Sequence, residues 1–169
     1  MFDLQLWMIQ PIGWALAMSL PIGLNISILE RFFGGEKHRQ LMNSTPSFKS
    51  TIQGLSWWTI LQLIVLGLVF LEEMIFRLPI CWIANGQFSL IVWLAILISG
   101  TIFGFLHMDK HKKTLSRPVW RMLWLISGII VGIVFGWLTV ATDSILPPLI
   151  VHFCNNVISL IESKIAFRF

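Results

Sequence analysis

Two adjacent carboxylates and a guanidinium lie inside a long apolar run, and this combination most constrains how the chain can fold. The run extends from about residue 55 to residue 84 and contains Glu72, Glu73 and Arg77. A charged side chain held within a bilayer costs roughly 2.5–3.5 kcal/mol on insertion scales, so charges there are candidates for function. The two glutamates could instead cap a span at the level of the lipid headgroups. The rest of the chain has to decide between these interpretations.

The composition indicates a membrane protein. Of the 169 residues, 56% are hydrophobic and only 12% are charged, compared with about 25% charged residues in soluble domains. The net charge of +4 does not indicate nucleic-acid binding, because the basic residues flank apolar runs. Cys81 and Cys154 lie in apolar surroundings without CxxC spacing, which is typical of small core residues.

Five apolar segments predict an all-α, polytopic transmembrane helix bundle of about five spans. The second segment contains Pro79, which removes a backbone donor and predicts a tilted or broken helix. The chain is too short for two ordinary domains, so we expect the spans to form one bundle. The segments run over about 6–29, 55–84, 88–107, 119–141 and 145–161.

The basic residues predict the orientation of the bundle. With five spans, every Lys and Arg except Arg77 falls on the same side of the membrane. The positive-inside rule then places the N-terminus outside and the C-terminus in the cytosol. The residues on that side are Arg31, Lys37, Arg39, Lys49, Lys110, Lys112, Lys113, Arg117, Arg121, Lys164 and Arg168.

The spacing of the charged residues predicts a division of labour within the second span. Residues four apart share one face of a helix, whereas neighbours are turned by about 100°. Glu73 can therefore pair with Arg77, which offsets the burial of both side chains. Glu72 points in a different direction, so we interpret Glu73 and Arg77 as structural and Glu72 as the chemical group.

Two further polar groups lie on later spans. His107 follows Phe103 by four residues at the end of the third span, and His152 precedes Asn156 by four residues in the fifth. A single buried pair of this kind is more typical of helix packing than of catalysis. Together with Glu72, however, these groups supply a carboxylate, two imidazoles and an amide, with Phe103 in structural support. Such an inventory suits hydrolysis.

The predicted depths of these groups conflict with a shared site. Residue counts from the ends of the spans distribute Glu72, His107 and His152 over about 18 Å of depth in upright helices. A shared site therefore requires that helix tilt, the break near Pro79 and a fifth helix that starts deep in the bundle bring the three together.

Three glycines form a stripe on the fourth predicted span. Gly128, Gly132 and Gly136 recur at every fourth position and so share one face of the helix. Small residues at this spacing let another helix approach closely. The stripe predicts a packing face with room for a neighbouring helix, rather than a ligand-binding loop.

The ordered set of polar motifs resembles that of the CPBP intramembrane protease family. This family includes the type II CAAX prenyl endopeptidases and the Abi-like bacteriocin-processing or immunity proteins. The resemblance covers about residues 55–161 and implies a protease domain at 51–169, after a first span and cytosolic loop at 1–50. It also implies an integral protein of a bacterial plasma membrane or an organellar membrane. The motifs are Glu72-Glu73-xxx-Arg77, Phe103-xxx-His107 and His152-xxx-Asn156.

The resemblance implies a metal-free reaction on a membrane-associated protein or peptide. Glu72 and His107 would hold and deprotonate the attacking water, and His152 and Asn156 would donate to the oxyanion of the tetrahedral intermediate. Membrane lipid is the expected surrounding, and no cofactor is implied.

Two alternatives remain open. Glu72, His107 and His152 could hold zinc as a His₂Glu set, but the HExxH motif is absent and the sequence reveals no second-shell partners. The same polar residues could also serve structurally in a membrane scaffold, an immunity protein or a proton relay. The scaffold interpretation predicts that Glu72→Gln leaves function intact, whereas the protease interpretation predicts that cleavage is abolished.

Overall fold

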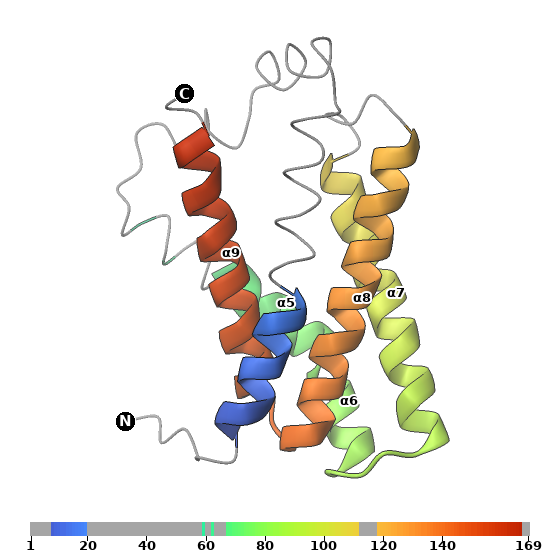
Figure 1. Ribbon diagram of the computed structural model, residues 1–169. Helices are drawn as coiled ribbons and strands as arrows, with labels where there is room; N and C mark the ends of the chain where they lie inside the picture. The colour runs from blue at the N-terminus through green and yellow to red at the C-terminus, as the bar shows by residue number, and fades with distance from the viewer. Residues whose placement is uncertain (1–7, 20–58, 60–61, 63–66, 112–117, 167–169) are drawn as a thin grey trace.

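The computed structural model describes residues 8–19, 59, 62, 67–111 and 118–166. Within these ranges the chain is helical apart from short turns and contains no strand, so the predicted all-α class is confirmed for them. The loop predicted after the first span, and most basic residues that predict the orientation, lie outside the described ranges. The described helices are 8–19, α5 (Leu68–Phe76), α6 (Leu78–Ala84), α7 (Leu90–His111), α8 (Pro118–Thr142) and α9 (Leu146–Ala166) (Figure 1).

Two of the described helices are long and apolar enough to cross a membrane. The qualifying stretches are Leu90–His107 in α7 and Arg121–Thr142 in α8, and α9 contributes a shorter apolar stretch, Leu146–Ile158. Large apolar side chains on α7 and α8 are exposed, as expected of helices that face lipid. The predicted number of spans and their orientation stay predictions.

Helices α7 and α8 run antiparallel and pack closely because glycines of both helices meet at their interface (Figure 1). A Cβ atom added to Gly132 would lie 2.7 Å from the Cα of Gly100, and one added to Gly128 would lie 2.8 Å from the Cα of Gly104. Gly136, the third glycine of the stripe, also faces α7. The stripe therefore serves as a packing face, and the helix that it contacts is α7 of the same chain.

The helix that carries the two glutamates breaks at Arg77, which separates α5 from α6. Pro79 stands in the first turn of α6, and it has no N–H to donate to the carbonyl of Ile75, four residues earlier. Hydrogen bonds on both sides of the break are kept, from Arg77 N to the oxygen of Glu73 (2.8 Å) and from Cys81 N to the oxygen of Arg77 (2.9 Å). The predicted break in this segment is confirmed.

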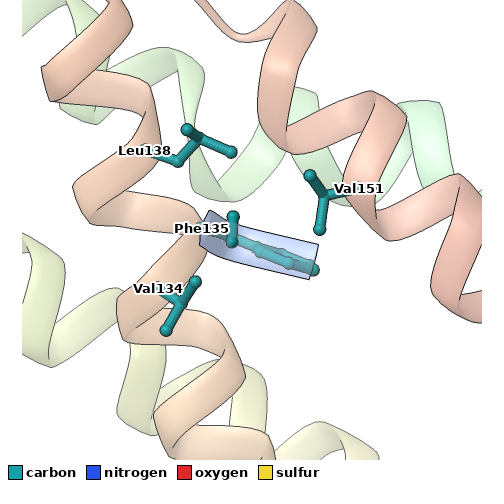
Figure 2. Packing of buried hydrophobic residues seen from close by; sticks show 5 residues of the cluster. Val134, Phe135, Leu138 and Val151 are labelled. Atoms are coloured by element: carbon teal, nitrogen blue, oxygen red, sulfur yellow. The ribbon is translucent and has the colours of Figure 1, made fainter. Parts of the chain in front are cut away.

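The first helix completes an apolar core with α8 and α9. Ala15 of the first helix, Phe135 and Leu138 of α8, and Val151 of α9 are fully buried against one another. Figure 2 shows the Phe135 ring extending from α8 toward α9, where Val151 faces it. Ile12, half-buried, packs against the same cluster. The first helix thus shares a core with α8 and α9, across the predicted division at residue 50.

Candidate active site

Side chains from three helices converge at one place in the bundle. Glu72 of α5, His107 of α7 and His152 of α9 each offer an atom within 4.8 Å of the others. The Oε2 atom of Glu72 lies 3.6 Å from Nε2 of His152 and 3.9 Å from Nε2 of His107. The structure therefore brings together three groups whose residue counts spread them over about 18 Å of depth in upright helices.

The second glutamate connects two buried groups. Glu73 is 1% exposed, and its Oε2 atom lies 3.3 Å from Nε of Arg77, so the predicted i,i+4 pair is present. Its other oxygen, Oε1, lies 2.7 Å from Nδ1 of His152. The spacing of residues along α5 could not reveal this second contact, because His152 follows Glu73 by 79 residues.

The buried guanidinium of Arg77 is enclosed by aromatic rings. Its central carbon lies 5.3–5.8 Å from the ring centroids of Phe76, Phe103 and Phe135, a distance at which cation–π attraction operates. Its Nη1 donates to Ser99 Oγ (2.8 Å), which donates to the carbonyl of Phe76 (3.2 Å). Within the described part of the chain, Nε and Nη2 lack partners in hydrogen-bond geometry, so Nε is held by charge attraction.

Phe103 contacts both histidines of the cluster. Its ring stacks on His107 with centroids 4.0 Å apart and an interplanar angle of 30°, and it meets His152 edge-on at 5.6 Å. Its backbone carbonyl accepts a hydrogen bond from Nδ1 of His107 at 2.9 Å. Phe103 is itself 3% exposed and therefore holds both rings against a packed surface.

Both histidines present Nε2 to the centre of the cluster because their Nδ1 atoms are already engaged. The carbonyl of Phe103 can only accept, so Nδ1 of His107 carries the proton. The ionised carboxylate of Glu73 likewise accepts from Nδ1 of His152. In the neutral form, each ring then directs an Nε2 lone pair toward Glu72. This arrangement can hold either a water molecule or a cation.

Solvent exposure divides the cluster. The side chains of Glu72 and His107 are 23% and 27% exposed, whereas that of His152 is 3% exposed. The cluster is therefore open on the side of Glu72 and His107, and His152 forms its inner wall.

Neighbouring asparagines on α9 take different positions. Asn156 lies one helical turn beyond His152 and is half-buried, and its role as an oxyanion donor stays a prediction. Asn155 instead bonds to the first helix, where its Nδ2 donates to Ser19 Oγ at 2.9 Å. Sequence reasoning missed this pair because Ser19 belongs to no motif, and the only available signal was a serine in an apolar helix.

The three converging residues fit a His₂Glu metal set. Histidine ligands of zinc usually donate their other ring N–H to a carboxylate or carbonyl, and Glu73 and Phe103 supply these acceptors here. Tetrahedral zinc with bonds of about 2.0–2.2 Å separates its ligand atoms by about 3.4 Å. A water molecule bonded at about 2.8 Å separates its acceptors by about 4.6 Å. The observed 3.6 and 3.9 Å fall between these values, so the geometry suits either occupant.

Comparison with known protein families finds a match to the family described as type II CAAX prenyl endopeptidase Rce1-like. The match covers residues 53–158, which is more than half of the chain and includes all three polar motifs. No curated protein and no solved structure gives a significant match.

Proposed function

The chain belongs to the Rce1-like family of type II CAAX prenyl endopeptidases, and we propose that it is an intramembrane endopeptidase that cleaves a membrane-associated protein or peptide. Proteins of this family are membrane proteases, which agrees with the two long apolar helices. The observation that carries the proposal is the convergence of Glu72, His107 and His152 from three helices onto one partly exposed point.

In the proposed reaction, water bound between Glu72 and His107 attacks the carbonyl carbon of the scissile peptide. Each of these residues presents an acceptor to the water: a carboxylate oxygen from Glu72 and the Nε2 lone pair from His107. Glu72 takes the proton as the carbon–oxygen bond forms, and it later transfers the proton to the leaving nitrogen. A positioned base of this kind contributes about 10²–10⁴ to the rate.

The oxyanion would form on the buried side of the cluster, near His152. Because Nδ1 of this ring donates to Glu73, donation to the oxyanion from Nε2 needs the doubly protonated ring, whose charge the oxyanion itself would balance. Asn156, one turn further along α9, is the second proposed donor. One such donor is worth about 10²–10³ in rate.

The first test is a comparison of native membranes that contain the wild type, Glu72→Gln or Asp143→Asn. Asp143→Asn is the matched control, because it makes the same change at an exposed carboxylate in the turn after α8. We expect mass spectrometry to find protein termini that are lost in Glu72→Gln and kept in Asp143→Asn, at equal protein levels. Identical termini in all three samples would reject proteolysis and favour a scaffold, immunity or proton-relay role.

A zinc-dependent form of the same reaction is the second candidate. The observation that favours it is the pair of second-shell acceptors behind the two histidines. Glu72, His107 and His152 would hold the ion, which when bound would polarise the peptide carbonyl and acidify water.

Metal analysis separates the two mechanisms. The metal-free mechanism predicts that purified protein contains no stoichiometric zinc and stays active after treatment with 1,10-phenanthroline. The zinc mechanism predicts one zinc per chain in the wild type, which is lost in His107→Gln and retained in Asp143→Asn. That result would reject the metal-free mechanism.

A further inference from the structure

Helix α9 carries two neighbouring stripes of residues with different contacts. His152 and Asn156 are four residues apart and form the stripe that includes the site. Val151 and Asn155 are also four residues apart, and they form a stripe turned by about 100°. Val151 is fully buried in the core that contains Ala15 of the first helix. One face of α9 therefore meets the first helix, while the adjacent face supplies the active site.

A partly buried polar contact joins the second stripe to the first helix. Ser19, the last described residue of the first helix, is 2% exposed. Its hydroxyl accepts from Nδ2 of Asn155 at 2.9 Å and approaches Oδ1 of the same side chain at 3.3 Å, within hydrogen-bonding distance. Ser19 is buried and Asn155 is half-buried. A rotation of α9 that parts them takes this partner from the buried hydroxyl, which favours one rotational setting of α9.

The apolar part of this interface leads directly to the site. Phe135 packs in the same core as Ala15, and its ring lies 5.3 Å from the ring of His152 and 5.8 Å from the guanidinium of Arg77. The first helix thus packs against α9, which carries His152, and against the Phe135 ring, which contacts His152.

We propose that the helix at 8–19 is a positioning element of the active site, in which Ser19 fixes the rotation of α9 and thereby the position of His152. The inference rests on the proposed function, and it extends the catalytic unit beyond the matched residues 53–158. A side-chain atom about 6 Å from a helix axis moves about 1 Å when the helix rotates by about 10°. Misplacement by about 1 Å can lower a catalysed rate about 10²-fold.

The experiment compares Ser19→Ala, Asn155→Ala and the double variant with Ser127→Ala. Ser127 is the matched control, because it is 5% exposed and its hydroxyl donates to the Trp124 carbonyl of its own helix. Histidine labelled with ¹⁵N in phospholipid nanodiscs gives a sparse spectrum, since the chain has only four histidines. The Nδ1–H resonance of His152 is identified by its loss in His152→Gln, and it reports the bond to Glu73 without any need for a substrate.

We expect Ser19→Ala and Asn155→Ala each to shift or broaden this resonance, and the double variant to do no more than either alone. Ser127→Ala should leave it unchanged, and Ser19→Thr, which keeps the hydroxyl, should restore it. With the substrate found by terminus profiling, kcat should fall by up to about 10²-fold at unchanged KM. An unaltered resonance in both single variants would overturn the inference, even if unfolding temperatures fall. Absence of cleavage by the wild type would instead refute the proposed function, and the resonance would still decide this inference.

Discussion

The cluster has an exposed half and a buried half, although both are built from the same residue types. Glu72 and His107 are about one-quarter exposed, and Oε2 of Glu72 lies 3.9 Å from Nε2 of His107. Glu73 and His152 are 1% and 3% exposed, and their atoms lie 2.7 Å apart. The atoms of the exposed pair lie beyond hydrogen-bonding distance, whereas those of the buried pair are hydrogen-bonded directly.

The difference shows how one dipeptide can serve two purposes. Glu72 and Glu73 are adjacent, so the turn of α5 alone sends one carboxylate toward the surface of the cluster and the other toward Arg77. A buried ion pair adds little net stability but is costly to break, so its members hold one fixed arrangement. The buried half therefore positions His152, and the proposed reaction assigns the chemistry to the exposed half.

The largest expected effect is a difference between the two glutamates when each is replaced by glutamine. Glu72→Gln should lower kcat by about 10²–10⁴ and leave the unfolding temperature unchanged, because the side chain is partly exposed. Glu73→Gln should lower the unfolding temperature, because it leaves the buried guanidinium of Arg77 without a counter-charge. Cleavage assays measure kcat of both variants in nanodiscs, and thermal unfolding measures their unfolding temperatures. Equal losses of stability would abolish the distinction between the two halves.

Removal of the buried cation should be the most destabilising change. Arg77→Met leaves Glu73 charged and buried, which costs about 3–5 kcal/mol of unfolding free energy. The double variant Glu73→Gln/Arg77→Met should recover part of this loss, since it removes both charges and keeps a hydrogen-bonding group beside His152. Chemical unfolding in a lipid environment measures all three proteins. A double variant that loses the sum of the single effects would show that the two charges do not act as a pair.

The contact between α7 and α8 should affect both stability and cleavage, because α7 carries His107 of the exposed half. Gly132→Ala places a methyl group 2.7 Å from the Cα of Gly100, which must move α7 away from α8. We expect a loss of about 1–3 kcal/mol in stability together with reduced cleavage. Gly13→Ala is the control, since in the described part of the chain no atom outside the backbone of its own helix lies within 4 Å of the added Cβ. A stable, fully active Gly132→Ala variant would mean that the position of α7 is set elsewhere.

The smallest effect is expected at the edge of the buried half. Ser99→Ala removes the acceptor of Arg77 Nη1 and should cost about 1 kcal/mol. Thr101→Ala, on the same helix, removes only a bond to the carbonyl of Leu97 and should change the stability by less than about 0.5 kcal/mol. Thermal unfolding of the pair measures the difference. A loss in Thr101→Ala as large as in Ser99→Ala would remove the special role of the arginine contact.

Features that depend on local helix geometry could be predicted from the sequence. The Glu73–Arg77 pair follows from i,i+4 spacing, and the break in its helix follows from the missing N–H of Pro79. The packing role of the glycine stripe follows from small residues at every fourth position. The face of α7 that packs against this stripe has a signal in the sequence as well, because Gly100 and Gly104 have the same spacing.

Features that depend on packing between distant helices could not be predicted. Residue counts assume upright helices, so they misplaced His107 and His152 relative to Glu72, which the folded chain brings together. The bond from His152 to Glu73 and the bond from Asn155 to Ser19 join residues far apart in the sequence, and no periodic pattern encodes either.

The distance along the chain between Glu73 and His152 has a consequence for biosynthesis. The ribosome completes α5 long before it reaches residue 152, 79 residues later. Until α9 emerges and docks, the nascent chain has its glutamates and His107 but lacks the inner wall of the cluster. The order of translation itself therefore means that the cluster is complete only after α9 has been made and has packed against α5.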